Sequence, residues 1–143
     1  MSSLSFPDVN VWLALSSPDH MHFASAWKWY STLPDQTVLM FCRHTQLGMM
    51  RLLTTQSVMG LGTLTQAQTW DVYDRWLEAG GVEFAMEPKG LDSTFRSLTA
   101  AQTASPKDWA DSYLAAFSSA ADVPLITFDK ALAEKAKRAV LLT

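Results

Sequence analysis

Three carboxylates and one amide lie close to the ends of short apolar stretches that are far apart in the chain. They are Asp8, Gln46, Asp111 and Asp129. Oxygen atoms of this kind, without cysteine and without a well-placed histidine, favour a hard cation such as Mg²⁺ or Mn²⁺ over zinc. If the four side chains converge, the site suits phosphodiester hydrolysis, because a bound cation orients the phosphate and generates hydroxide from water.

The elements that must position these residues alternate along the chain. We predict strands over 3–6, 37–42, 82–86 and 124–127, with an edge strand over 140–142. We predict helices over 9–15, 20–30, 43–54, 65–77, 91–100, from 106 to about 117, and 130–137, with a loop over 55–63. Strands that alternate with helices indicate an α/β fold with a parallel sheet covered on both faces.

The carboxyl ends of parallel strands share one edge of a sheet. Asp8, Gln46 and Asp129 each come just after such an end, and Asp111 lies in the helix that leads into the strand at Leu125. Two or three carboxylates at one place repel one another unless a cation lies between them or one is protonated. For Asp8 and Asp129 a simple helix cap is the alternative, since aspartate is a common N-cap residue.

Four further residues are candidates for support of this site. Asn10 could hydrogen-bond Asp8 or a phosphate, and Thr127 could support Asp129 or bind a water. Arg43 could bind a phosphate. Asp108 lies three residues before Asp111 and shares its helix face, so it is either a helix cap or a substitute for a missing acid.

Three local signals concern helix boundaries and packing. Ser105 is predicted to cap a helix whose first residue is Pro106, with Asp108 closing a capping box. That helix is predicted to turn Trp109 toward the core. Gly48, inside a predicted helix, costs about 1 kcal/mol relative to alanine, and a close approach by another group would explain it.

Length, charge and cysteine content exclude several classes of protein. The 143 residues suit one domain, residues 1–143, and 48% are hydrophobic. The net charge of −3 provides no overall basic field for nucleic acid, so RNA binding would need a local patch or bound metal ions. The single Cys42 excludes an internal disulfide and a cysteine cluster for zinc. No signal segment or membrane-length apolar run is present, which favours a soluble cytoplasmic protein.

Four segments in order resemble PIN-domain ribonucleases, especially VapC-type toxins of bacterial toxin–antitoxin pairs. They are Asp8-Val9-Asn10, the segment 45–53 (TQLGMMRLL), the segment 109–117 (WADSYLAAF) and the segment 125–132 (LITFDKAL). The resemblance covers nearly the whole chain. It implies a three-layer α/β/α sandwich with a central parallel sheet, and Asp8, Asp111 and Asp129 as the metal-binding acids.

The resemblance also implies a metal-dependent endoribonuclease, often acting on structured RNA, that forms a homodimer and is silenced by a cognate antitoxin. One position departs from the family pattern, because many relatives have a glutamate where this chain has Gln46. Gln46 could ligate weakly or hold a metal-bound water, but it adds no charge. The alternative is therefore a catalytically weakened module that binds RNA or a partner. An aspartyl-phosphate phosphatase is disfavoured, since it would need an acid where Asn10 lies.

Overall fold

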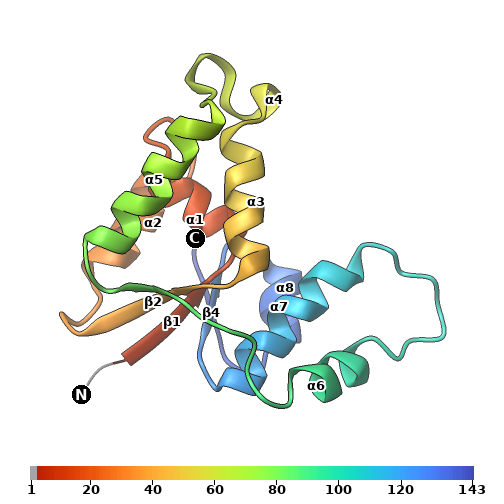
Figure 1. Ribbon diagram of the computed structural model, residues 1–143. Coiled ribbons are helices and arrows are strands. Elements are labelled where there is room, and N and C mark those ends of the chain that lie inside the picture. The colour runs from red at the N-terminus through yellow and green to blue at the C-terminus, as the bar shows by residue number, and fades with distance from the viewer. Residues whose placement is uncertain (1–2) are drawn as a thin grey trace.

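A five-stranded sheet forms the centre of the protein, for which a computed structural model describes residues 3–143 (Figure 1). The strands are β1 (Ser3–Pro7), β2 (Thr37–Phe41), β3 (Val82–Phe84), β4 (Leu125–Thr127) and β5 (Ala139–Leu141). Every neighbouring pair is parallel, and the order is β3-β2-β1-β4-β5. The carboxyl ends of the strands therefore share one edge, as predicted.

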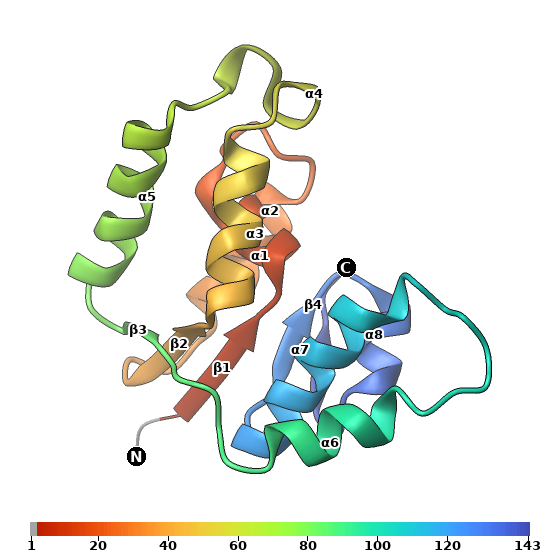
Figure 2. The ribbon, with the colours of Figure 1, turned by 45° about the vertical axis from the view of Figure 1, so that its right-hand side comes forward.

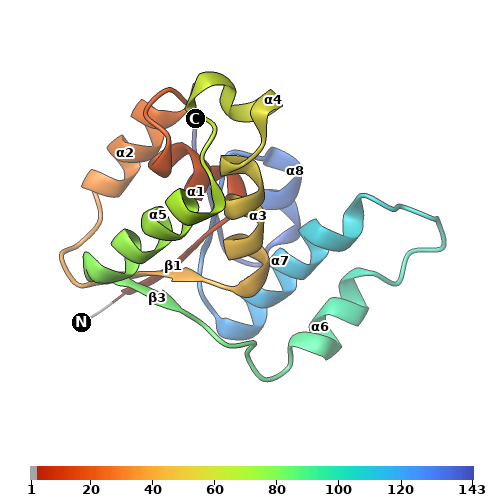
Figure 3. The ribbon, with the colours of Figure 1, turned by 45° about the horizontal axis from the view of Figure 1, so that its top comes forward.

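Helices connect these strands. They are α1 (Val9–Ser16), α2 (Phe23–Ser31), α3 (Arg43–Leu53), α4 (Gln56–Met59), a 3-10 turn η1 (Gly60–Gly62), α5 (Gln66–Glu78), α6 (Leu91–Leu98), α7 (Asp108–Ala121) and α8 (Lys130–Lys135). Helix α3 lies between α5 and α7 (Figure 3). Helices α6 and α7 lie side by side, and the segment that joins them loops away from the body of the molecule (Figure 2). Within residues 3–143, no helix is long and apolar enough to span a membrane.

The two faces of the sheet are buried in separate hydrophobic cores. Successive side chains of a strand point to opposite faces. Phe41 accordingly joins a core with residues of α1, α3 and α5, whereas Met40 joins a second core with residues of α6, α7 and α8. On β4, Ile126 likewise belongs to the first core and Leu125 to the second. This arrangement confirms the predicted three-layer α/β/α sandwich.

Most predicted boundaries agree with the structure to within a few residues, but the helix predicted to begin at His20 begins at Phe23. The backbone N–H of His22 donates to His20 Nδ1 over 3.0 Å, and this local bond holds the segment in a turn. The predicted loop over 55–63 is also wrong in part, because α4 and η1 fill most of it.

The predicted start of α7 is wrong. Ser105 has a φ of 34° and its hydroxyl pairs with Thr103 Oγ1, so it does not cap the helix. The helix begins at Asp108, which places Asp111 in its first turn. Trp109 points outward and is 56% exposed, contrary to the predicted inward orientation, because α6 packs beside α7 and leaves this ring at the rim of their contact.

Gly48 lies where α3 crosses the start of α1. A Cβ atom at this position would lie 2.5 Å from Cγ2 of Val9 and 2.9 Å from its Cγ1. Since these distances are far shorter than a carbon–carbon contact, only glycine lets the two helices approach this closely. The close approach predicted from the sequence is therefore confirmed, and it involves the residue that follows Asp8.

Candidate functional site

The order of the strands creates a crevice between β1 and β4. From β1 the chain continues to β2 and β3 on one side and then returns to β4 and β5 on the other. In parallel α/β sheets, ligands bind at the carboxyl edge where the winding direction reverses in this way. Asp8 directly follows β1, and Asp129 follows β4 by two residues. The two predicted acids therefore flank the switch point of the sheet.

Asp8 is a buried carboxylate that also caps α1. Its Oδ1 accepts a hydrogen bond from the backbone N–H of Val11 at 3.0 Å, and its own N–H donates to the carbonyl of Ile126 at 2.9 Å. The side chain is 4% exposed, and this burial raises its pKa from 3.8 to about 6. Hydrogen bonds from Thr127 and from the backbone N–H groups of Val11 and Asn10 lower the pKa in part. Asp8 is therefore both the predicted cap and a group whose charge is costly to bury.

Thr127 connects Asp8 to Asp129. Its buried hydroxyl donates to Asp8 Oδ2 and accepts the backbone N–H of Asp129 at 2.9 Å. Asp129 in turn caps α8, since its Oδ1 accepts from the N–H groups of Ala131 and Leu132 at 2.9 and 3.2 Å. The charge of Asp129 raises the pKa of Asp8, which places the two carboxylates close enough to repel each other. Thr127 thus holds two acids at fixed positions across the crevice.

Asp111 approaches the same edge from the first turn of α7. Burial raises its pKa, and the charge of Asp129 raises it further, whereas the charge of Lys135 lowers it. The Lys135 ammonium lies 3.3 Å from Asp108 Oδ1, so Asp108 is half of an ion pair. The structure therefore brings Asp111 near Asp129, with Asp108 on the side that faces α8.

Two residues near Asp111 were not predicted as site residues. Lys135 reaches the first turn of α7 from α8, and His44 approaches Asp111 from α3. Burial lowers the pKa of His44, and the charge of Asp111 opposes this effect. Both contacts depend on how helices pack across the sheet edge, which no local pattern in the sequence indicates.

Gln46 and Arg43 form a pair on α3. Arg43 Nη1 donates to Gln46 Oε1 over 2.5 Å, and the guanidinium lies over the Phe84 ring, 4.7 Å from its centroid. Gln46 is 3% exposed, so its amide is a buried group whose oxygen already has a partner. Such i,i+3 pairing follows from helix geometry. Position 46, where the family resemblance implies an acid, is therefore engaged by a cation of the protein itself.

Asn10 has an exposed side chain on the first turn of α1, and only its backbone N–H acts on Asp8. No three His, Cys, Asp or Glu side chains between residues 3 and 143 are close enough together to form a ready metal cluster. The donor chemistry nevertheless suits a hard cation, since Mg²⁺ is usually held by one or two carboxylates together with water and substrate phosphate. The mutual repulsion of the three aspartates is what such a cation would offset.

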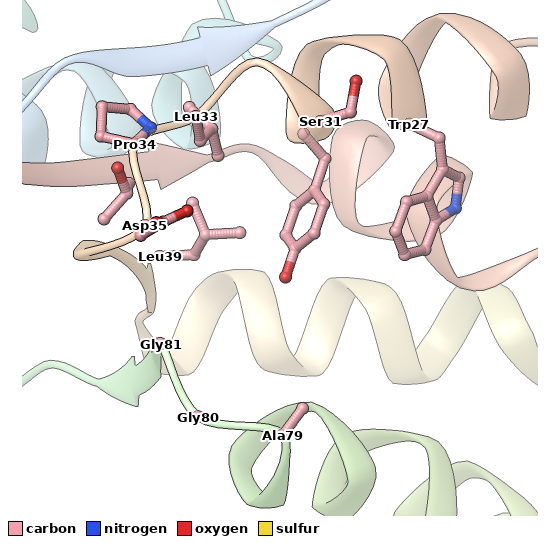
Figure 4. A pocket seen from close by; sticks show the side chains of 11 residues that line it. Trp27, Ser31, Leu33, Pro34, Asp35, Leu39, Ala79, Gly80 and Gly81 are labelled. Atoms are coloured by element: carbon pink, nitrogen blue, oxygen red, sulfur yellow. The ribbon is translucent and has the colours of Figure 1, made fainter.

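A cavity of about 590 Å³ lies apart from these acids (Figure 4). It is lined by Trp27 of α2, by Pro34 and Asp35 just before β2, and by Gly80 and Gly81 just before β3. It opens at the amino end of these strands, whereas the aspartates lie beyond the carboxyl ends. The cavity is therefore not the candidate active site.

Sequence comparison decides the family. No family model matches the chain. Ribonuclease VapC41 of Mycobacterium tuberculosis is 36% identical over 131 residues, which span 89% of this chain and 90% of that protein. The chain belongs to the VapC family of ribonucleases. The resemblance stated from the four sequence segments is thereby confirmed.

Solved structures of VapC proteins share this fold. VapBC2 of Rickettsia felis, solved with a DNA fragment from the promoter, has a TM-score of 0.66 at 11% identity over 98% of this chain and 99% of that chain. VapC20 of Mycobacterium tuberculosis, described as a toxin that cleaves the sarcin–ricin loop, has a TM-score of 0.67 at 14% identity over 91% and 93%. Both likenesses confirm the predicted PIN-like α/β/α architecture.

Proposed function

We propose that this chain is a metal-dependent endoribonuclease toxin that hydrolyses RNA phosphodiester bonds and is neutralised by a cognate antitoxin. The observation that carries the proposal is the placement of Asp8 and Asp129 on either side of the switch point, joined through the Thr127 hydroxyl. Family membership supports the ribonuclease activity, and the names of VapC20 and VapBC2 support a toxin that assembles with an antitoxin.

Asp8, Asp111 and Asp129 would hold the divalent cation, with Mg²⁺ the first choice and Mn²⁺ the second. When bound, the cation supplies a water-derived hydroxide near neutral pH and stabilises negative charge on the phosphate. Asp129 Oδ1 is occupied by two backbone N–H groups, while its Oδ2 has no hydrogen-bond partner among residues 3–143. That free oxygen supports a ligand role in addition to the cap. Thr127 fixes the orientation of Asp8, so the buried carboxylate meets the crevice in one geometry.

Gln46 favours a second candidate function. Its oxygen accepts from Arg43 and the residue carries no charge, so the site has one acid fewer than the usual family pattern. Weaker cation binding follows from the lower negative charge. The alternative is a module that binds RNA or an antitoxin without cutting. In either case, Arg43 and Asn10 would meet the RNA backbone at the rim of the crevice.

Protein partners are supported by exposed apolar side chains. Leu47 on α3, Val58 on α4, Leu61 on η1 and Trp70 on α5 are each at least 46% exposed. Exposed apolar side chains of this size can serve in protein–protein contacts. We propose that these side chains serve a homodimer or an antitoxin contact, that the substrate is structured RNA, and that the protein acts in the cytoplasm.

The test uses the full chain, purified free of any partner, with total RNA and Mg²⁺ or Mn²⁺. The parent protein should give discrete cleavage products, and a chelator should abolish them. Asp8→Asn should not cut, whereas Asp71→Asn, which changes an exposed aspartate of α5, should cut like the parent. Equal cutting by Asp8→Asn would overturn the site assignment. Retained RNA or antitoxin binding without any cutting by the parent would support the second candidate.

A further inference from the structure

Trp109 presents an indole ring to solvent on the first turn of α7. The side chain is 56% exposed, and the only aromatic ring paired with it among residues 3–143 is that of Phe95 on α6. The two ring centroids are 6.1 Å apart, with an angle of 69° between the planes. This edge-to-face contact supports the indole from one side. The exposed side is free to stack with a flat ligand.

Two cavities meet at this indole. One, of about 260 Å³, lies against the loop between α6 and α7 and includes Thr99, Thr103, Ser105 and Asp108 in its wall. The other, of about 410 Å³, lies against α6. The smaller cavity is below the roughly 300–1,000 Å³ that drug-sized ligands occupy. It therefore suits a single flat ring system.

The lining of the smaller cavity indicates the chemistry of its occupant. Its wall contains an indole face, three hydroxyl groups and the Asp108 carboxylate, but no lysine or arginine. Lys135 pairs with that carboxylate from outside the wall, so a phosphate would meet no unpaired cation there. An unpaired nucleobase, by contrast, stacks on an aromatic face and offers donors and acceptors at its edge. An RNA base fits this wall better than a phosphate does.

Asp108 connects the smaller cavity to the candidate active site. It lines the cavity and pairs with Lys135, whose charge also acts on Asp111. Asp108 and Asp111 are three residues apart and share a helix face, whereas Trp109 is turned about 100° from Asp108 and about 160° from Asp111. A base on Trp109 would therefore lie across α7 from Asp111, with Asp108 between the two. This position suits a nucleotide some way along the RNA from the cleaved bond.

We propose that Trp109 and the hydroxyl-lined loop at residues 99–105 form a pocket for one unpaired nucleobase of the RNA, away from the position of cleavage. The proposal rests on the proposed endoribonuclease function and adds a residue that contributes to substrate selection. It assigns Trp109 to RNA binding, while the three aspartates carry the chemistry.

The test measures binding of a fluorescently labelled single-stranded cytidine decamer to the full chain made inactive by Asp8→Asn. Adding Trp109→Ala should weaken binding roughly 5- to 100-fold, the range expected when one base–aromatic stack is lost. Trp109→Phe should restore most of the affinity, because a phenyl ring still stacks. The control is Met21→Ala, since Met21 is 85% exposed and does not line the pocket; it should bind like the parent. Thermal unfolding of each variant checks that it is folded.

In the active background, Trp109→Ala should also change which sites in total RNA are cut. Unchanged decamer binding by folded Trp109→Ala, or failure of the Asp8→Asn chain to bind the decamer, would overturn the pocket. Loss of binding to the antitoxin with unchanged RNA binding would assign the surface to a protein and equally overturn it. Failure of the proposed function is distinguishable, because in that case the parent itself does not cut RNA.

Discussion

The Thr127 hydroxyl donates a hydrogen bond to Asp8 Oδ2 while it accepts the backbone N–H of Asp129. One buried side chain thus determines the positions of two acids that arrive from opposite ends of the chain. Because Thr127 lies on β4 and Asp8 directly follows β1, the pairing of these two strands sets the geometry of the site. The cap of α1, the pairing of β1 with β4 and the candidate active site therefore share the contact between Thr127 and Asp8.

Replacing Thr127 with valine should damage both stability and activity. Valine fills the same space but leaves Asp8 Oδ2 and the N–H of Asp129 without their partner. The buried carboxylate oxygen costs about 1–3 kcal/mol, and the partly buried N–H costs less. The hydrogen bond from Thr127 lowers the pKa of Asp8, so its loss should raise that pKa above 6. RNA cleavage should then reach half of its maximum at a higher pH. Thr127→Ser, which keeps the hydroxyl, is the control and should retain the parental pH profile.

The Asp8→Asn variant should be more stable than the parent at neutral pH although it is inactive. The folded parent keeps the Asp8 proton up to about pH 6, whereas the unfolded chain releases it near the ordinary value of 3.8. Folded protein therefore binds more protons between these values, and stability falls as pH rises through this window. The difference between the folded and unfolded pKa values of Asp8 lowers the unfolding free energy by about 3 kcal/mol above pH 7. Asparagine carries no charge, so it avoids this penalty.

Chemical denaturation at several pH values, in a chelating buffer, checks this prediction. The difference in unfolding free energy between Asp8→Asn and the parent should be largest above pH 7 and vanish below pH 4. Adding Mg²⁺ at pH 7.5 should stabilise the parent more than the variant, because a cation binds the ionised carboxylate. A constant difference across the pH range would contradict the assigned pKa.

Gly48→Ala should destabilise the protein although alanine is the better helix former. The new Cβ would overlap with Val9 Cγ2, and overpacking of this kind costs roughly 1–3 kcal/mol, which outweighs the gain of about 1 kcal/mol in helix propensity. Adding Val9→Ala should recover part of the loss, so the two changes should be non-additive. Gly62→Ala is the matched control, since its Cβ would meet only the end of Met59 at 4.0 Å. Thermal unfolding of Gly48→Ala, Val9→Ala, their combination and Gly62→Ala measures the effect.

Residue types and spacing predicted the parts of the fold that depend on local chemistry. Asp8 and Asp129 cap the helices that they precede, as their residue type predicts. The sequence also predicted that both acids reach one edge, because parallel strands leave little alternative. The predicted start of α7 was wrong, because the Ser105 hydroxyl bonds with that of Thr103 instead of capping the helix.

Apart from the close approach at Gly48, contacts between helices were the part that the sequence did not predict. The outward orientation of Trp109 depends on the packing of α6 against α7, and the ion pair of Lys135 with Asp108 depends on α8. Neither contact has a periodic signal, since each is set by how elements lie on the sheet. The bond from Arg43 to Gln46 is different, because residues three apart on a helix are expected to meet. This bond matters because it occupies the oxygen of Gln46, the residue at the position where the family resemblance implies an acid.

Gln46→Glu alone should change Mg²⁺ affinity little. The new carboxylate would take the place of an amide oxygen that already accepts from Arg43 at 2.5 Å, so the added charge would be neutralised by the guanidinium. Combining Gln46→Glu with Arg43→Met removes that cation and should raise Mg²⁺ affinity at least about tenfold, equivalent to 1.4 kcal/mol. Calorimetric titration of Mg²⁺ into both variants, with Arg43→Met alone as the control, makes the comparison. A tenfold gain from Gln46→Glu alone would show instead that position 46 faces the cation directly and that Arg43 does not hold it.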